Sequence, residues 1–261
     1  MNDLSKCEPK ENWRYWFFLM EDNAALTLEA IEKKKRSVPK GTKIYKNKIL
    51  GLRGKATGLV FSNFEYSKHV IDKEKAKEKK YICFSAGLDT AYSSQSNDTI
   101  SMIFIGITDK REIIVLDEKV YNNKDLDTPI APSDTAKNFV DFLERNRNEW
   151  GLARNVFVDS ADQATITELN KFKRNNPCVY VFNGAYKKIT IIDRINLQLG
   201  WLHTEQYLVL EHCKNHITEL DTYSWLEDKD NTPEDANDHT INAAQYSWIP
   251  YKSRIGIESN K

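Results

Sequence analysis

Three β-strand patterns follow one another in the middle of the sequence, and this order strongly limits the folds that the chain can adopt. Residues 81–89, 99–108 and 111–122 are rich in β-branched and aromatic side chains, and a short turn at Asp109 and Lys110 joins the last two. After residue 130 the periodicity changes, and helical and extended segments alternate. Three adjacent strands followed by this alternation predict a mixed sheet with helices on both faces.

The alternating segments continue through the second half of the chain. A hairpin is expected around residues 201–212, and the closing helix is expected to begin near Thr232 and Pro233, a favourable pair for a helix start. The other predicted elements are helices at 133–150, 164–175, 190–201 and 213–226 and strands at 155–159 and 178–184. This element order resembles that of the ribonuclease H-like superfamily, so we expect an α/β fold of that class.

A charged run at residues 70–80 separates a basic N-terminal part from the predicted α/β domain. The run has the composition of a solvated linker or an exposed helical turn, which places the domain boundary near residue 75. Residues 1–75 would then form a helical and irregular appendage, and residues 76–261 the α/β domain. The first 80 residues hold 19 Lys and Arg against 11 Asp and Glu, although the whole chain has a formal net charge of zero.

Composition excludes several classes of protein. No apolar run approaches the roughly 18 residues of a membrane span, and the first residues lack the order of a secretory signal, so we expect a cytoplasmic protein without a membrane partner. The four cysteines lie far apart and form no CxxC pair, which argues against a disulfide framework or a zinc ribbon. His212 and His216 flank Cys213 at helical spacing, but packing of an amphipathic helix is favoured over a zinc site there.

Two aspartates end predicted strands that should be neighbours in the sheet. Asp89 ends the first strand and Asp159 ends the fourth, and in this strand order both lie at the same carboxyl edge. Two carboxylates brought close together in a partly desolvated place repel each other unless a cation lies between them. A pair of Mg²⁺ or Mn²⁺ ions held in this way cleaves phosphodiesters. Either aspartate alone is more simply explained as a strand-end turn residue.

The segment NDHTINAAQYSW, residues 237–248, carries a second group of candidate ligands. Helical spacing places His239, Asn242 and Tyr246 on one face, with Asp238 one turn before Asn242. This face is either ordinary packing or a set of ligands. His239 would contact a metal or orient a water molecule, or it would simply hydrogen-bond to a neighbouring group.

Four segments resemble, in order, motifs of the C-terminal nuclease of the large terminase subunit of tailed bacteriophages. The resemblance covers about residues 80–250. Its segments are GLDTAYSSQSNDTISMIFIGI with Asp89 and Asp98, VFVDSADQATITEL with Asp159, EHCKNHITELDTYSW with Glu219, Tyr223 and Trp225, and DHTINAAQY with His239. The first two motifs are individually weak, and the ordered set of four is moderately specific.

The resemblance implies a metal-dependent endonuclease that cuts concatemeric viral DNA during genome packaging. Asp89 and Asp159 would hold two Mg²⁺ or Mn²⁺ ions, His239 and Asn242 would complete the catalytic site, and Asp238 would support the metals. Lys187 and Lys188 would bind DNA phosphates, or they belong to a solvated loop. Basic residues of the first 80 would help to track the DNA backbone. The implied partners are double-stranded DNA, an ATPase half on another chain, the small terminase subunit and the portal, in the cytoplasm of an infected bacterium.

The sequence departs from the family pattern at Asn242, where the family carries its third metal-binding aspartate. An amide oxygen still ligates Mg²⁺ or Mn²⁺, but it brings no charge and weakens the second metal. Three interpretations are open: a natural variant helped by Asp238, an engineered inactivating change, or a lineage whose nuclease is slow or lost. A resolvase or transposase-type nuclease, and a docking module without catalytic activity, are the alternative functions.

The first part of the chain lacks the motif that an ATPase motor needs. The segment GLRGKATG, residues 51–58, does not fit the phosphate-binding pattern GxxxxGK[ST], so we expect no ATP site. Residues 1 to about 70 resemble the stretch that links the motor half of a terminase to its nuclease half. The chain therefore resembles the second half of a terminase, from a divided gene or a shortened chain.

Overall fold

The computed structural model describes residues 25–36, 58–90, 99–122, 130–186, 188–226, 232–234 and 238–256. The chain divides into two compact units, residues 1–57 and residues 58–261. In the first unit the described residues include helix α1 (Leu28–Arg36). The division differs from the expected boundary near residue 75, because Phe61 and Phe64 are buried in the core of the second unit. The relation of the first segment to an ATPase half stays a prediction.

A mixed sheet forms the centre of the second unit. Within the described residues its strands are β1 (Val70–Ile71), β2 (Tyr81–Thr90), β3 (Thr99–Thr108), β4 (Ile113–Asn122), β5 (Asn155–Val158), β6 (Val181–Gly184) and β7 (Tyr207–Leu210). They lie in the order β1-β7-β4-β3-β2-β5-β6. The strands β2, β3 and β4 form the antiparallel meander that the sequence predicts, and β5, β6, β7 and β1 join it in parallel.

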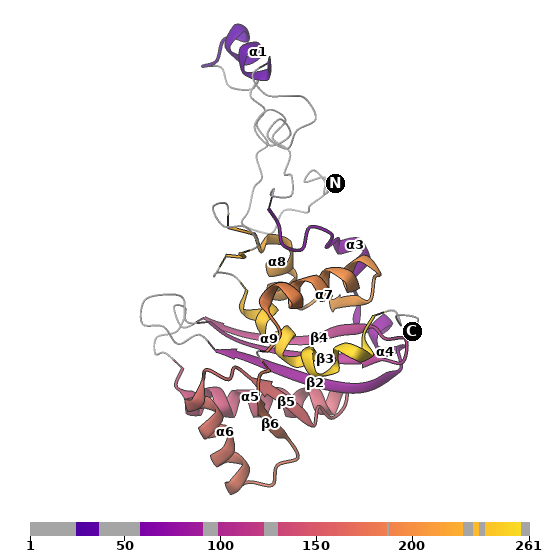
Figure 1. Ribbon diagram of the computed structural model, residues 1–261, viewed down its shortest axis with the longest axis vertical. Helices are drawn as coiled ribbons and strands as arrows, with labels where there is room; N and C mark the ends of the chain where they lie inside the picture. The colour runs from indigo at the N-terminus through magenta and orange to yellow at the C-terminus, as the bar shows by residue number, and fades with distance from the viewer. Residues whose placement is uncertain are drawn as a thin grey trace, which may run out of the picture. The chain divides into compact units, whose positions relative to one another are not determined.

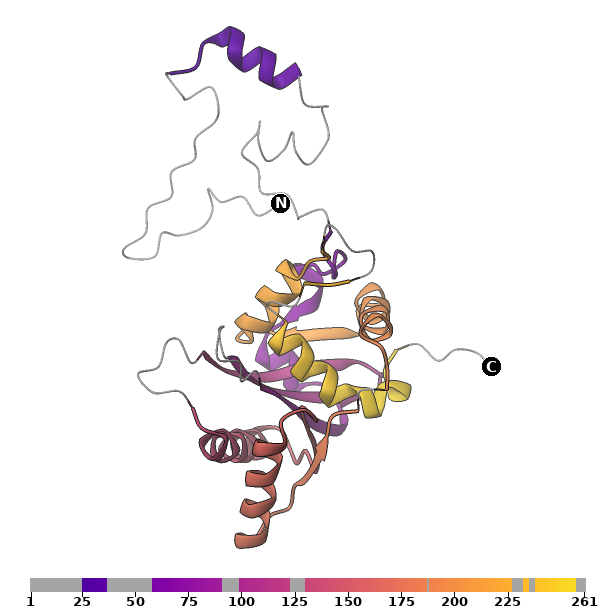
Figure 2. The same cartoon turned by 60° about the vertical axis from the view of Figure 1, so that its left-hand side comes forward.

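Helices cover both faces of this sheet. Figure 1 shows α5 (Pro132–Glu149) and α6 (Gln163–Asn175) on one face, and α7 (Ile191–His203), α8 (Lys214–Thr222) and α9 (His239–Trp248) on the other. Figure 2 shows the same two layers after rotation. The shorter elements are α3 (Tyr66–His69), α4 (Lys73–Lys77) and the 3₁₀ helix η4 (Ile249–Arg254). The expected ribonuclease H-like architecture is confirmed. No helix among the described residues has both the length and the apolar character to cross a membrane.

Two expectations about individual elements need correction. The charged run at 70–80 contains the short helix α4, in agreement with the expected helical turn, and Asp72 caps it by accepting a hydrogen bond from the Lys75 N–H. The run also contains the strand β1, which pairs in parallel with β7 and was not expected. The expected hairpin around residues 201–212 does not form, because residues 201–203 complete α7. The following strand β7 pairs in parallel with β4 and β1.

The helix α9 rests directly on the backbone of β2. A Cβ atom added to Gly87 would lie 1.8 Å from the carbonyl oxygen of Ala243. Real side-chain atoms do not approach backbone so closely, so only glycine fits this position of β2. Ala243 and Ala244 are fully buried at the contact. Small residues on both elements therefore fix the distance of α9 from the strand that carries Asp89.

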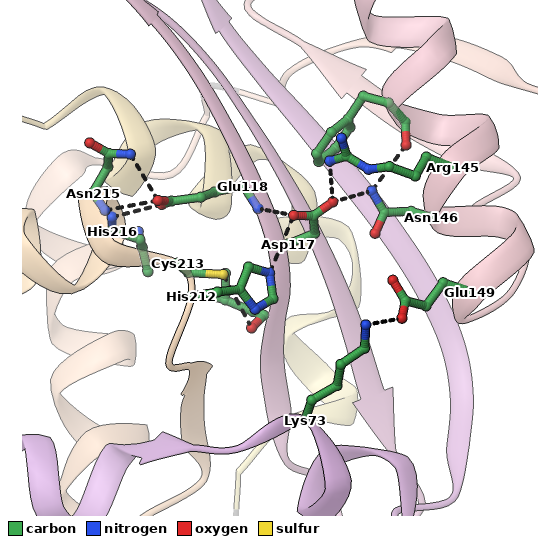
Figure 3. Close-up of polar contacts among 12 residues, drawn as sticks. Lys73, Asp117, Glu118, Arg145, Asn146, Glu149, His212, Cys213, Asn215 and His216 are labelled. Carbon is green, nitrogen blue, oxygen red and sulfur yellow. Dashed lines mark hydrogen bonds and ion pairs between the residues drawn. The ribbon is translucent and has the colours of Figure 1, made fainter.

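Adjacent carboxylates of β4 anchor helices on the two faces of the sheet (Figure 3). Asp117 accepts hydrogen bonds from Arg145 and Asn146 of α5, whereas Glu118 accepts from the backbone N–H groups of Asn215 and His216 at the start of α8. Burial alone would raise the pKa of Asp117, but hydrogen bonds from His212, Arg145 and Asn146 hold it below its usual range. The helices α5 and α8 are thus tied to the same strand.

The residues that could suggest a zinc site have separate partners in this region. His212 Nε2 lies 3.4 Å from Asp117 Oδ1, and the Cys213 thiol points to the carbonyl of Val115. His216 lies in the core, where it contacts Tyr207. Packing against the sheet, which the sequence favoured, accounts for Cys213 and His216, whereas His212 is exposed and pairs with Asp117.

Candidate functional site

The structure places Asp89 and Asp159 side by side at the carboxyl ends of β2 and β5. Leu88 and Val158 are paired in the parallel register, and the Asp159 N–H donates to the Leu88 carbonyl at 2.9 Å. The side chains come from the positions that follow this pair on each strand. Asp89 is 6% exposed, and Asp159 is half-buried. The juxtaposition that the strand order predicts is therefore present.

The turn after β5 holds Asp159 and joins it to α6. Its Oδ1 accepts a hydrogen bond from the Ala161 N–H at 2.8 Å, a local contact typical of an aspartate that shapes a turn. Asp162 caps α6 by accepting from the Thr165 N–H, and it also accepts from the Thr90 hydroxyl at 2.7 Å. Asp162 thus links the end of β2 to α6. Its position just before a helical pattern is a cap signal that the sequence-based prediction missed.

The first turn of α9 brings the other candidate ligands to the same place. His239 Nδ1 lies 3.2 Å from Asp89 Oδ2, so it contacts the carboxylate at the end of β2. Asn242 donates from its Nδ2 to Asp238 Oδ2 at 3.0 Å, and the Tyr223 hydroxyl donates to the same oxygen at 3.3 Å. The structure therefore joins His239 to Asp89, which lies beside Asp159. It also joins Asn242 to Asp238, the residue that precedes His239.

The carboxylate of Glu219, from helix α8, caps the first turn of α9. Glu219 Oε2 accepts hydrogen bonds from the Thr240 N–H at 2.9 Å, the Thr240 hydroxyl at 2.5 Å and the Ile241 N–H at 3.1 Å. The helix therefore begins at His239, and the expected start near Thr232 and Pro233 is wrong. Pro233 instead forms a bridge with Trp225. The cap comes from a residue 21 positions before Thr240, which local patterns do not reveal.

The chain of polar contacts behind Glu219 continues into the core. Because the Thr240 hydroxyl donates to Glu219, it accepts from His216 Nδ1 at 3.0 Å, and His216 Nε2 then accepts from the Tyr207 hydroxyl at 2.8 Å. Burial lowers the pKa of His216 to about 3, so this ring is neutral. Burial also raises the pKa of Glu219 to about 7.

Negative charge accumulates at the site. Burial raises the pKa of Asp89, and the carboxylates of Asp159 and Asp238 raise it further, while the hydrogen bond and charge of His239 act against this shift. The hydrogen bond to Asp89 in turn raises the pKa of His239, against the effect of its burial. Such a group of carboxylates favours a bound cation, since a cation removes the repulsion between them.

The donor atoms at the site are those that hard divalent cations prefer. Asp89, Asp159 and Asp238 offer carboxylate oxygens, and Asn242 offers an amide oxygen, a set that suits Mg²⁺ or Mn²⁺ better than Zn²⁺. Among the residues that the structure describes, no three His, Cys, Asp or Glu side chains are grouped closely enough to hold a metal ion.

The expected DNA-binding lysines are only partly covered by the structure. Lys188 is exposed, and its Nζ lies 6.0 Å from the centre of the Tyr186 ring. It follows β6, whose last residue Gly184 is paired with Val158, so it leaves the sheet at the same edge as Asp159. Lys187 and Asp98 lie outside the described residues.

Comparison with known proteins shows similarity of fold. The sequence matches no protein-family model and no curated protein. A solved large terminase of a thermophilic bacteriophage, in complex with ADP, is 20% identical with a TM-score of 0.61, and the match covers 90% of this chain and 54% of that one. The large terminase nuclease domain of P22 is 10% identical with a TM-score of 0.52, covering 74% and 92%. The chain spans about half the length of the thermophilic phage protein.

Proposed function

We propose that residues 58–261 form a metal-dependent DNA endonuclease of the phage large-terminase type, which cuts concatemeric viral DNA during genome packaging. The observation that carries this proposal is the pair Asp89 and Asp159 at adjacent strand ends, with His239 bound to the first of them. The fold shared with the P22 nuclease domain supports it, because that domain is a nuclease on the same architecture. Because one fold hosts many functions, the proposal rests on the residues of the site and not on the fold alone.

Each residue of the site has a proposed role. Asp89 and Asp159 would hold two Mg²⁺ or Mn²⁺ ions, with the amide oxygen of Asn242 and the carboxylate of Asp238 supporting the second. Bound ions of this kind activate water and stabilise the leaving oxygen of a phosphodiester. His239 orients the Asp89 carboxylate and offsets part of its charge.

The DNA and the partner proteins are also proposals. Lys188, and Lys187 beside it in the sequence, would contact phosphates next to the site, and the basic residues of the first 80 would follow the DNA backbone. The family resemblance adds an ATPase half on another chain, the small terminase subunit and the portal, in the cytoplasm of the bacterial host. The expectation that this chain has no ATP site stays a prediction, because residues 51–57 lie outside the described part.

A docking module without catalytic activity is the second candidate function. Asn242 supports it, because its amide group donates to Asp238 and so compensates that carboxylate without a metal. A site of this kind keeps the fold and the helix α9, but it carries the neutral Asn242 where a charged ligand would bind a cation more tightly. The same packaging motor would then use the domain as a contact surface.

Plasmid nicking in Mn²⁺ separates these functions. The assay compares the natural chain with the variants Asn242→Asp and Asp89→Asn. Asn242→Ala is the control for loss of the amide. We expect the natural chain to nick slowly, Asn242→Asp to act about tenfold faster because a charged ligand replaces a neutral one, and Asp89→Asn to be inactive. Cleavage by Asn242→Asp alone would identify Asn242 as the lesion. No cleavage by the natural chain or by Asn242→Asp would favour the docking module.

Metal binding gives a second measurement that does not depend on cleavage. A cation that binds only the folded protein raises the midpoint of thermal unfolding, and tighter binding raises it further. We expect MnCl₂ to raise the midpoint for the natural chain and more strongly for Asn242→Asp, but not for Asp89→Asn. Equal shifts in all three proteins would place the bound metal elsewhere.

A further inference from the structure

The contacts between α7 and α9 place Arg194 beside the candidate site. Gln245 of α9 donates to Gln198 of α7 at 3.4 Å, and one turn later Trp201 packs edge-on against Trp248 with ring centres 4.8 Å apart. Later residues of α7 thus contact later residues of α9, so the two helices run in the same direction at this interface. Arg194 lies one turn before Gln198, so it is level with the first turn of α9, which carries the candidate ligands.

The surroundings of Arg194 agree with this register. Its guanidinium group is within electrostatic range of the carboxylates of Asp238 and Asp89, and of the hydroxyls of Tyr246 and Tyr223. Burial lowers the pKa of Arg194, although these four groups act in the opposite direction. The side chain is thus a cation near the acidic groups of the site. Its helix α7 lies on the same face of the sheet as α9 (Figure 1).

One donor of this cation has no partner. Among the residues that the structure describes, Arg194 Nε is buried and donates no hydrogen bond to a protein acceptor. Leaving a charged donor buried and unpaired is costly, and such costs persist where a ligand completes the contact. The guanidinium carries five N–H donors in a planar fork that matches the oxygens of a phosphate.

We infer that Arg194 binds a non-bridging phosphate oxygen of the DNA backbone next to Asp89 and Asp159. This inference rests on the proposed function and adds a substrate-binding residue to it. The carboxylates that hold cations repel the DNA phosphates, so a protein cation among them offsets that repulsion. Lys188 lies six residues earlier, in the loop that leads into α7, and would supply a second positive charge to the DNA backbone.

A purely structural role for Arg194 makes different predictions. In that role its charge would only neutralise Asp238 and Asp89, and removing it would lower the stability of the fold without changing the dependence of DNA binding on salt. Arg194→Gln removes the charge and keeps a polar side chain of similar length, whereas Arg194→Lys keeps the charge and loses the planar fork. Arg174, exposed at the end of α6, provides the matched control Arg174→Gln.

The test measures binding of a labelled duplex of about 20 base pairs by fluorescence anisotropy in CaCl₂ over a range of KCl concentrations, together with plasmid nicking in MnCl₂. We expect Arg194→Gln to weaken duplex binding about tenfold at low salt and to reduce the salt slope by about one, the value for one lost phosphate contact. Arg194→Lys should keep the slope and lose less affinity. Arg174→Gln should match the natural chain.

The outcomes separate this inference from the proposed function. Unchanged affinity and salt slope in Arg194→Gln, or a change that Arg174→Gln reproduces, would overturn the role of Arg194 even if the natural chain nicks DNA. A reduced slope in Arg194→Gln without nicking by any variant would support the phosphate contact and count against the nuclease. Failure of the natural chain to bind the duplex would overturn the inference itself.

Discussion

His239 Nδ1 lies 3.2 Å from Asp89 Oδ2, although 150 residues separate the two positions along the chain. This contact joins the end of β2 to the first turn of α9. Because β5 places Asp159 beside Asp89, the same contact brings three distant segments of the chain together. Each of the interactions that hold this arrangement can be tested by substitution.

Replacing Asp89 by Asn should lower the pKa of His239 in the metal-free protein. The carboxylate of Asp89 is the main cause of the raised pKa, first through its hydrogen bond and then through its charge. An NMR titration of the histidine ring protons measures the change. The ring signals of His212, whose acidic neighbour is Asp117, serve as the internal reference, because this residue does not contact Asp89. A His239 pKa that does not change would show that the contact does not form in solution.

Gly87→Ala should destabilise the domain by about 3 kcal/mol, because the added methyl group would overlap the Ala243 carbonyl and push α9 away from β2. Denaturant unfolding gives the free energy. Gly200→Ala is the matched control, since no atom lies within 4 Å of its added Cβ and it lies in the helix α7. That control should stabilise the protein by about 0.5–1 kcal/mol through helix propensity. Similar effects of the two substitutions would contradict the close packing of α9.

Glu219→Ala should be less stable than Glu219→Gln by about 2 kcal/mol, because only Gln keeps an oxygen that accepts the hydrogen bonds of Thr240 and Ile241. Both variants remove the buried charge, so the comparison isolates the cap of α9. Urea unfolding at about pH 8, above the pKa of the natural carboxyl, measures the difference. Equal stability of the two variants would mean that α9 does not depend on this cap.

The burial of His216 should make the fold less stable in acid. The pKa of His216 is about 3 in the folded chain, against an ordinary value of 6.5, so the unfolded chain binds an extra proton between these values. The free energy of unfolding should therefore fall as the pH decreases through this range, by at most about 1.4 kcal/mol per pH unit from this residue. His216→Gln should show a shallower dependence over that range. An unchanged slope in His216→Gln would contradict the burial of this ring.

Much of the architecture could be predicted from the sequence, because it depends on local periodicity. The strand β3 spans Thr99–Thr108, the range that its apolar pattern indicates, and α5 lies within one residue of the predicted helix at each end. The juxtaposition of Asp89 and Asp159 also follows from the strand order alone. These features need only the alternation of side chains and the topology of the sheet.

The missed features depend on contacts between distant segments. The strand β1 has two residues inside a charged run, and it becomes a strand only because β7 offers a parallel edge. Glu219 caps α9 from another helix, which is why Thr232 and Pro233 gave a misleading helix start. Arg194 carries no motif, and only its register against α9 directs attention to it.

The position of α9 against β2 also governs when the site exists at all. A chain in which α9 has detached still holds Asp89 and Asp159 at neighbouring strand ends, but it lacks His239 and Asn242 beside them. Detachment of α9 alone would thus separate the candidate site residues while most of the sheet stays intact. In the proposed nuclease, a newly made chain would therefore become active only after α9 has packed against Gly87.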